Sequence, residues 1–232
     1  MQADKGLEHV VVDETHCVNQ WGYEFRPDYF HALNLLLRMC RAMDLNEPTP
    51  FLLLSATITA SDRARLQAVM SGDSGGAGSP LPLLARPDSF SNPLRTHIAV
   101  EPRRVRGTLN DRRNFDKALA ERLPHIEEAV SAARSNRAST GQRSAVIVFV
   151  SSRYHAEVLA QRLARATSGQ VDYYHAGLDA GSREEIYTRF LDGDLSVLVA
   201  PKAFGMGMDI PDIHWVVHLA PPGYLEDYLQ EV

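Results

Sequence analysis

The chain has 232 residues with 44% hydrophobic and 23% charged residues and a net charge of -5, a composition typical of globular proteins that excludes disordered, collagen-like and coiled-coil chains. No apolar run approaches the roughly 18 to 20 residues of a membrane-spanning helix, and no basic segment leads into an apolar one at the N-terminus, so we expect a cytoplasmic protein without a membrane partner. The two cysteines, Cys17 and Cys40, are too few for a disulfide framework or a four-cysteine zinc site, and we expect both to be reduced.

Short apolar or β-branched runs alternate with amphipathic stretches along the chain. The runs predict strands over 10–12, 51–54, 145–150, 171–174, 196–200 and 215–219. The stretches predict helices over 28–43 and 153–166, and a capping box of Ser182 and Glu185 predicts the start of a third helix with Ile186 and Phe190 on its inner face. Since continuous apolar strands are typical of sheets that helices cover on both faces, we predict an α/β fold with mainly parallel sheets.

The middle of the chain is expected to connect two domains. Residues 71–80 (SGDSGGAGSP) predict a flexible surface loop. Residues 110–139 predict helices with a break at Pro124, and four apolar residues recur there at helical spacing: Phe115, Leu119, Ile126 and Val130. We place the domain boundary between Pro93 and Leu109.

The segment 95–143 is strongly basic, with ten arginines and one lysine against six acidic residues. Because the whole chain is acidic, any nucleic-acid contact must come from a local patch such as this one. A solvated helical face is the alternative, and the sequence does not decide between them. We therefore predict a first domain over 1–95, a basic helical linker or insertion over 96–143 and a second domain over 144–232.

The first strand ends in two carboxylates and an imidazole, in the run Val-Val-Val-Asp-Glu-Thr-His over residues 10–16. In α/β sheets, ligands bind outside the carboxyl ends of strands, so acids at this position face a binding crevice. Asp13 would hold a magnesium ion through its water shell, while Glu14 would polarise an attacking water. A polar turn after a buried strand is the alternative.

An aromatic-rich loop follows the acids and precedes the first helix. It contains Trp21, Tyr23 and Phe25, which a solvent-exposed loop would rarely carry together. Aromatic faces stack on nucleobases at about 1 to 3 kcal/mol per base, and Arg26 can pair with phosphate through two hydrogen bonds. A small satellite core is the alternative.

Three further motifs lie in the second half of the chain, each after a predicted strand. The first is Ser151-Ser152-Arg153, and the second is the run Tyr-His-Ala-Gly-Leu over 174–178, in which His175 has a structural role as its alternative. The third, over 199–212, contains Gly205 and Gly207, which permit a close approach of the backbone to a ligand. A simple tight turn is the alternative for these glycines.

These motifs together resemble those of RecQ-type superfamily 2 DNA helicases. The run DETHCVNQWGYEFRPDY resembles their Walker B motif and adjoining aromatic-rich loop, and Leu53-Leu54-Ser55-Ala56-Thr57 resembles their Ser-Ala-Thr motif. The strand and turn over 147–153 and the runs 174–178 and 199–212 resemble motifs of their second RecA-like domain. The resemblance covers 8–60 and 144–232 and implies two RecA-like domains, the first incomplete.

The resemblance also implies a role for each motif residue, with ATP and Mg2+ as cofactors and single-stranded DNA and duplex junctions as partners. The catalytic residues would be Asp13, Glu14, His16 and Gln230. Asp13 would organise magnesium, and Glu14 would activate water. Ser55, Ala56 and Thr57 would couple the nucleotide state to domain movement. The cofactor would be bound by Gly205, Gly207 and Asp209, of which Asp209 would contact a ribose hydroxyl across an interdomain cleft. DNA contact would fall to Gln20, Trp21, Phe25, Arg26, Ser152, Arg153, His175, Lys202 and Phe204.

The chain also departs from the family pattern. Pro201 stands where the family usually has threonine, and Lys202 would replace that contact as a point charge on phosphate. No G-x-x-x-x-G-K-[ST] loop occurs, and the chain stops where the resemblance leads into an arginine-rich motif. We therefore expect a helicase fragment with little or no ATP hydrolysis of its own, which would be nucleoid-associated in a prokaryote.

Two other functions are weighed against the helicase. The first is a non-hydrolysing DNA-binding or scaffolding module, which the missing phosphate loop favours. The second is a metal-dependent nuclease built on Asp13, Glu14 and His16, although the sequence supplies no further carboxylates of the kind such sites gather. ATP turnover with and without single-stranded DNA separates the helicase from the first.

Overall fold

The computed structural model describes residues 9–15, 27–42, 49–55, 58, 60–71, 96–109, 114–165, 167–201, 204, 210, 212–221, 228 and 231. The chain divides into two compact units, Met1–Arg95 and Thr96–Val232, each of which is described by itself. Among the helices in the described part of the chain, none combines the length and the apolarity needed to cross a membrane.

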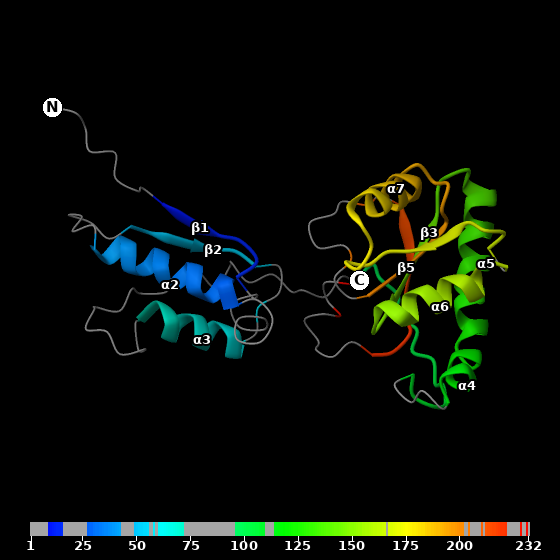
Figure 1. Cartoon of the computed structure of the whole chain (residues 1–232), viewed down its shortest axis with the longest axis horizontal. Coiled ribbons are helices and arrows are strands. Elements are labelled where there is room, and N and C mark those ends of the chain that lie inside the picture. Colours follow the sequence, from blue (N-terminus) through cyan, green and yellow to red (C-terminus); the bar gives the residue numbers. More distant parts are fainter. Residues whose placement is uncertain are drawn as a thin grey trace. The chain divides into compact units, whose positions relative to one another are not determined.

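The first unit pairs two short parallel strands with two helices (Figure 1). Strand β1 (Val10–Val12) runs beside β2 (Phe51–Leu53), with Val11 opposite Leu52. Helices α2 (Pro27–Ala42) and α3 (Ala60–Ser71) pack on one face of the strands. Their shared core consists of Val10, Val12, Leu33, Leu37, Leu66 and Met70.

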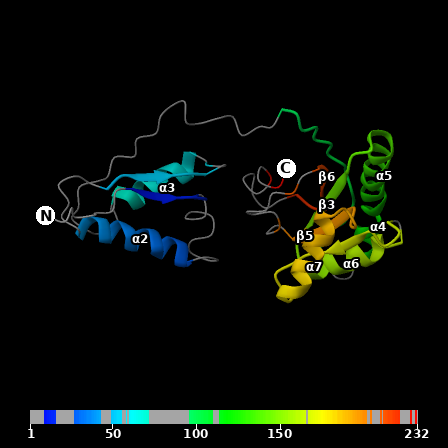
Figure 2. The same ribbon diagram turned by 90° about the horizontal axis from the view of Figure 1, so that it is seen from above.

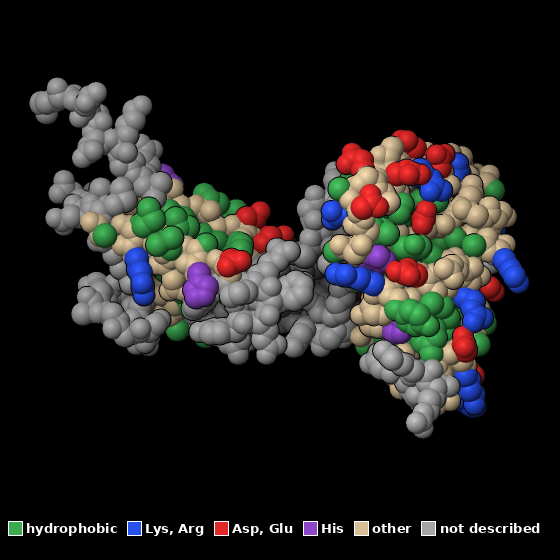
Figure 3. Space-filling view, in the orientation of Figure 1, with side chains coloured by type: hydrophobic (Ala, Val, Ile, Leu, Met, Phe, Trp, Pro, Cys, Tyr) green, Lys and Arg blue, Asp and Glu red, His purple; other side chains and the backbone are tan. Residues whose placement is uncertain are grey.

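The other face of this small sheet is open to solvent. Alternation along a strand sends successive side chains to opposite faces, and Val11 and Leu52 are accordingly 60% and 53% exposed. Figure 3 shows apolar side chains gathered on the surface of this unit. Parallel sheets are normally covered on both faces, so the described part of this unit supplies one of the two layers that such a sheet requires.

The periodicity of α2 is confirmed. Leu33 and Leu37 are 2% exposed, and the other members of the predicted stripe, Tyr29, Leu36 and Cys40, pack partly buried against the same core. Cys40 is a free thiol, as expected, whereas Cys17 lies outside the described residues. The helix ends at Ala42, one residue earlier than predicted.

The second unit is a three-layer α/β structure (Figures 1 and 2). Its strands β3 (Ala145–Val150), β4 (Val171–Tyr173), β5 (Val197–Pro201) and β6 (Ile213–His218) lie in the order β4-β5-β3-β6. All of their pairings are parallel, which confirms the predicted sheet type. The predicted strand over 145–150 has the observed bounds, β4 ends one residue earlier than predicted, and β5 and β6 differ by one or two residues at each end.

Helices cover both faces of this sheet because every residue of β3 is apolar and buried. On one face, Val146, Val148 and Val150 pack against α4 (Phe115–Ala120), α5 (Leu123–Thr140) and α6 (Arg153–Leu163). On the other face, Ile147 and Phe149 pack with α7 (Ala180–Leu191) through Ile186 and Phe190. The prediction for these two α7 residues is confirmed.

The predicted basic insertion is structurally part of the second unit. Its apolar residues Phe115, Leu119, Ile126 and Val130 are buried in the same core as β3, so α4 and α5 form one layer of the domain. The prediction separated them from the domain because basic residues outnumber acidic ones in this segment, yet the apolar stripe decides the packing. Pro124 lies in the first turn of α5, where a missing N–H costs no helical hydrogen bond.

The start of α7 corrects the predicted capping box. The helix begins at Ala180, and Asp179 is its N-cap: Oδ1 accepts from the Ser182 backbone N at 2.9 Å and Oδ2 from the Ser182 hydroxyl at 2.6 Å. These hydrogen bonds lower the pKa of Asp179 because they stabilise its charged form. Ser182 therefore lies inside the first turn of α7, where it donates to Asp179 and is not itself the N-cap.

A buried arginine joins distant parts of the second unit. The guanidinium of Arg122 donates to four backbone carbonyls: Leu219 at 3.0 Å, Arg106 at 3.2 Å, Ala118 at 2.6 Å and Gly107 at 2.9 Å. Arg122 is only 9% exposed, and burial lowers its pKa. One side chain therefore ties the segment before α4 to the end of α4 and to the residue after β6.

Replacement of Arg122 by methionine should destabilise the second unit by about 2 to 4 kcal/mol, because four buried or half-buried carbonyls would lose a charged donor. The measurement is urea unfolding, with hydrogen exchange of the β3 amides to identify the transition of this unit. Arg165→Met, at an exposed arginine after α6, is the control and should leave that transition within about 0.5 kcal/mol of the wild type. Equal stability of the two variants would contradict the role assigned to Arg122.

Candidate functional site

The acid turn of the first unit follows β1 directly and is held to the end of β2. The backbone N of Thr15 donates to the Leu54 carbonyl at 2.9 Å. The Thr15 hydroxyl lies 2.6 Å from the same carbonyl oxygen and 3.1 Å from that of Val12. Because Thr15 is 1% exposed, this clamp is shielded from water, and it fixes where Asp13 and Glu14 leave the strand.

The backbone of the turn adopts an uncommon conformation at Glu14. Its φ of 49° lies in the left-handed region, which costs a residue with a side chain about 1 kcal/mol or more. The Asp13 Oδ1 accepts from the Glu14 backbone N at 2.8 Å, and the Tyr29 hydroxyl donates to the Asp13 carbonyl. These bonds, with the Thr15 clamp, hold the strained conformation in place.

Sequence reasoning missed both Thr15 and Tyr29 as parts of this site. A hydroxyl residue directly after the two acids was a local signal for the Thr15 clamp. No such signal existed for Tyr29, which lies 16 residues from Asp13 and was expected only on the inner stripe of α2. The contact exists because α2 packs against the strand that carries the acids.

The carboxylate of Asp13 fits a magnesium ion held mainly by water and phosphate. The side chain is exposed at the carboxyl end of β1, where a ligand can approach. Within the described residues, no group of three His, Cys, Asp or Glu side chains could hold a metal ion. A single carboxylate suits magnesium, which commonly binds through one or two carboxylates plus substrate phosphates.

The turn after β3 carries two serines and begins α6. Ser152 is the N-cap of this helix, and its hydroxyl accepts from the His155 backbone N at 3.2 Å. The Ser151 hydroxyl lies 2.9 Å from Nδ1 of His155. The Ser152 hydroxyl therefore caps α6, and Arg153 is the exposed first residue of that helix.

His155 connects this turn to the segment before α4. Its ring stacks on Phe115 with the ring centres 4.9 Å apart and is 8% exposed. Burial lowers the pKa of His155, and a hydrogen bond to the Leu109 backbone raises it in part. The Ser151 hydroxyl and the Leu109 backbone are thus the two polar partners of this buried ring. No local sequence pattern indicates this connection, because Leu109 and His155 are far apart in the chain.

His175 has a structural role in this arrangement. Its Nε2 lies 3.1 Å from the Glu157 carboxylate, and its Nδ1 accepts from the Gly177 backbone N at 3.2 Å. The ring stacks on Tyr173 and is 7% exposed. With both ring nitrogens bound to protein groups, His175 corresponds to the structural alternative and not to the predicted direct contact with DNA.

The Arg153 side chain lies beside His175 and Gly177. A Cβ at Gly177 would lie 3.0 Å from Nη1 of Arg153 and 3.2 Å from Nδ1 of His175, so the arginine packs across this glycine. Ser152, Arg153 and His175 therefore meet at the carboxyl ends of β3 and β4. Arg153 is the exposed member of this group and the one able to bind a phosphate.

Phe204 is a correction to the predicted DNA contacts. Its ring is 4% exposed and packs edge-on against Tyr174, with the ring centres 4.9 Å apart, in the core beneath α7. A ring in this position cannot stack on a base. The large apolar surface of the ring explains why it is buried in the core, although the sequence predicted a ligand-binding motif around it.

Of the remaining predicted site residues, the structure describes Ser55. Ser55 lies half-buried two residues after β2, among the described residues. The others lie outside the described residues, and their roles stay predictions: His16, Gln20, Trp21, Phe25, Arg26, Ala56, Thr57, Lys202, Gly205, Gly207, Asp209 and Gln230.

A histidine–glutamate pair that the sequence did not reveal lies at the end of β6. The Nε2 of His218 is 2.7 Å from the Glu231 carboxylate, and both side chains are largely buried. The His218 ring stacks on Phe149 of β3. The two partners are 13 residues apart with no shared periodicity, so no local pattern indicates the pair. Glu231 directly follows Gln230, one of the predicted catalytic residues.

Residues 125–232 match the family described as the helicase conserved C-terminal domain. The chain is 32% identical over 222 residues to the probable ATP-dependent DNA helicase RecS of Bacillus subtilis, covering 96% of this chain and 37% of that protein. It is 29% identical to the ATP-dependent DNA helicase RecQ of a Synechocystis species, covering 97% of this chain and 40% of the relative. A crystal structure of the helicase MrfA bound to DNA has a TM-score of 0.58 at 18% identity, covering 97% of this chain and 27% of MrfA, and shows the fold alone.

Residues 125–232 of the second unit are therefore similar to helicase conserved C-terminal domains, and the chain shares the fold of the corresponding part of MrfA. The chain is thus similar, over at least 96% of its length, to proteins named as the ATP-dependent DNA helicases RecS and RecQ, as its motifs predicted. It spans about two fifths or less of the length of these relatives.

The buried neutral His155 should make the stability of the second unit depend on pH. Its folded pKa is below its ordinary value of 6.5, so its stabilising effect is complete above about pH 6.5 and is lost as the pH falls through the folded pKa. Between pH 7.5 and about 5, the urea midpoint of the wild type should therefore fall more than that of His155→Gln. His214→Gln, at an exposed histidine, should keep the wild-type slope. Equal slopes for wild type and His155→Gln would contradict this assignment.

Proposed function

We propose that this chain works as part of a RecQ-type ATP-dependent DNA helicase that couples ATP hydrolysis to movement on single-stranded DNA and to duplex unwinding. The observation that carries the proposal is the acid turn after β1, where the Thr15 clamp holds Glu14 in a strained conformation directly after Asp13. Homology to RecQ-like helicases supports the same assignment. The proposed place of action is DNA in the cytoplasm, or the nucleoid in a prokaryote.

The two carboxylates would divide the work of hydrolysis. Asp13 would hold a magnesium ion through its water shell, and the ion would neutralise charge on the phosphate oxygens. Glu14 would orient a water molecule and accept its proton. The locked backbone supports this division, because a general base contributes only when it is held within hydrogen-bond reach of the proton that it removes.

The carboxyl edge of the second unit would contact the DNA backbone. Arg153 offers a planar guanidinium to phosphate, and Ser152 and His175 would position it by fixing the start of α6 and the loop after β4. Phosphate contacts of this kind determine the register of the strand without reading its sequence. Duplex junctions as preferred substrates belong to the same proposal.

Replacement of Glu14 by glutamine should lower DNA-stimulated ATP turnover by about 100-fold or more, because the amide cannot accept the proton of water. The measurement is steady-state ATP hydrolysis with and without single-stranded DNA, on the complete product of the reading frame that encodes this chain. Glu184→Gln removes an exposed carboxylate from α7 and should leave turnover unchanged. Unchanged turnover in Glu14→Gln contradicts the proposal, and so does DNA binding without any hydrolysis, which would indicate a binding module.

Replacement of Gly177 by alanine should weaken single-stranded DNA binding about three- to tenfold, because the new Cβ displaces the Arg153 side chain. Fluorescence anisotropy of a labelled oligothymidylate at fixed salt measures the affinity of the 232-residue chain. Arg153→Ala should weaken binding at least as much and lower the salt dependence by about one phosphate contact. Gly181→Ala, at a helical glycine of α7, is the control. Wild-type affinity in both Gly177→Ala and Arg153→Ala would refute the DNA contact.

A further inference from the structure

A surface tyrosine lies next to the arginine that is proposed to contact DNA. Tyr154 is 61% exposed, whereas every other tyrosine in the described ranges is half-buried. It is not among the residues for which the motifs predicted a role. Its ring presents a flat, largely apolar surface to solvent, and a planar ligand can cover such a surface.

The fold places Tyr154 at the same edge of the sheet as Arg153. Helix α6 starts directly after β3, with Ser152 as its N-cap and Arg153 and Tyr154 as its first two residues. Both residues therefore lie at the carboxyl end of β3. The backbone N–H groups in the first turn of a helix have no acceptor within the helix and carry partial positive charge. The first turn of α6 thus combines an exposed ring with groups that favour phosphate.

The side chains of Arg153 and Tyr154 point toward different neighbours. Successive residues of a helix are about 100° apart around its axis. Arg153 packs across Gly177 in the loop after β4. Tyr154 contacts Phe115, the first residue of α4, with the ring centres 5.8 Å apart. A strand that runs over the start of α6 from Gly177 toward Phe115 would therefore meet the guanidinium and then the ring.

Two buried rings hold the Tyr154 ring from beneath. It is tilted by 49° on Phe115 and by 55° on His155, whose ring centre is 5.9 Å away. Phe115 and His155 are 7% and 8% exposed and stack on each other. These contacts orient the ring while most of its surface stays accessible. A ring that is oriented before a ligand arrives loses little conformational entropy on binding, and tyrosine has only two side-chain torsions to fix.

The charges around Tyr154 are balanced. Glu157 is one helical turn further along α6, and its carboxylate lies 3.1 Å from Nε2 of His175. Asp116, next to Phe115, pairs with Arg162 at 2.7 Å. The two carboxylates are thus matched by the guanidinium groups of Arg153 and Arg162. A phosphate backbone is not repelled from the ring, and a base can reach it.

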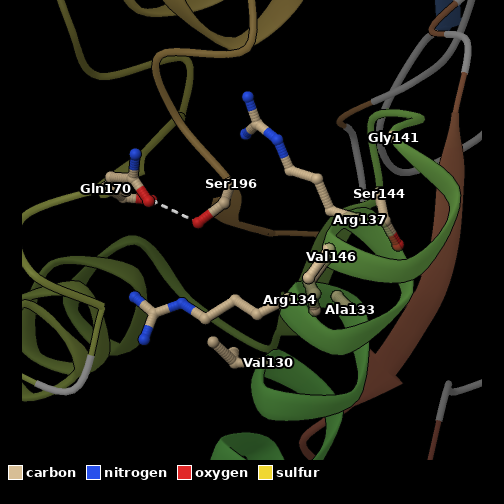
Figure 4. Close-up of a pocket in the computed structure, with 10 residues that line it drawn as sticks. Val130, Ala133, Arg134, Arg137, Gly141, Ser144, Val146, Gln170 and Ser196 are labelled. Atoms are coloured by element: carbon tan, nitrogen blue, oxygen red, sulfur yellow. Dashed lines mark hydrogen bonds between the residues drawn. The ribbon is translucent and has the colours of Figure 1, made fainter.

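The amino edge of the same sheet lacks this combination of groups. A pocket of about 440 Å³ opens there, and its Arg134 and Arg137 side chains point to opposite sides of the hydrogen bond between Ser196 and Gln170 (Figure 4). No aromatic residue is among the described residues that line it. A nucleobase would find no ring to stack on in this pocket, in contrast to the start of α6.

We propose that Tyr154 stacks on a nucleobase of the single strand whose phosphate backbone Arg153 contacts. Aromatic side chains beside basic ones are the usual components of surfaces that bind single strands, because every base has a face that can stack. The contact would therefore not depend on the identity of the base. In a duplex the base faces are covered by their neighbours, so Tyr154 would favour single strands. This inference rests on the DNA contact proposed above for Arg153.

Fluorescence anisotropy of the 232-residue chain tests the proposal with two labelled probes of equal length and charge, an oligothymidylate and the same backbone with abasic sites in place of its bases. Tyr154→Ala should weaken binding of the oligothymidylate about fivefold or more, because the stacking of one base is lost. Its affinity for the abasic strand and its salt dependence should equal those of the wild type, since no phosphate contact is removed. Tyr154→Phe keeps the ring and should bind the oligothymidylate as the wild type does.

Circular dichroism and the urea midpoint verify that the variants are folded. Wild-type affinity of Tyr154→Ala for the oligothymidylate overturns the proposal, and so does an equal loss for both probes. If Arg153→Ala weakens binding while Tyr154→Ala does not, the stacking contact alone is refuted. If Tyr154→Ala weakens binding of the oligothymidylate alone while Arg153→Ala binds as the wild type does, the stacking contact stands and the phosphate contact is refuted. Absence of binding by the wild-type chain overturns both.

Discussion

Parallel pairing of the strands is the constraint on which the arrangement of the second unit depends. Because β3 pairs in parallel with β5 and β6, and β4 with β5, every strand of this sheet ends at the same edge. Motifs that lie more than twenty residues apart in the chain, such as those around Ser152 and His175, thereby become neighbours. The buried apolar strand β3 makes this possible, since helices can cover it on both faces.

The sequence predicted well those features that depend on local periodicity. The strand over 145–150, the inner stripe of α2 and the break at Pro124 all appear in the structure, because alternation and helical spacing directly reflect which side chains are buried. The family resemblance, in contrast, assigned Phe204 to DNA contact, although its ring packs in the core. A motif indicates which backbone segment borders a ligand but not which way each side chain points.

Features that depend on long-range contacts could not be predicted. The bond between Tyr29 and Asp13 and the stack of His155 on Phe115 join segments whose order in the chain carries no information about their contact. The predicted N-cap of α7 was wrong for another reason. Asp179 and Ser182 are both good N-cap residues, and packing decides between them. The acid turn was recognised as a site, but the Thr15 clamp that gives it a defined geometry emerged only from the fold.

The four acceptors of Arg122 are all backbone carbonyls, and this distinguishes it from an ion pair. A carbonyl oxygen takes up no proton in the physiological range, and a guanidinium does not release one there. The segment at Arg106 and Gly107 is therefore held to the second unit by bonds that acidification leaves intact, even where a neighbouring imidazole gains charge. The attachment of Arg106 and Gly107 to the second unit therefore does not depend on pH, whereas the charge of the neighbouring imidazole does.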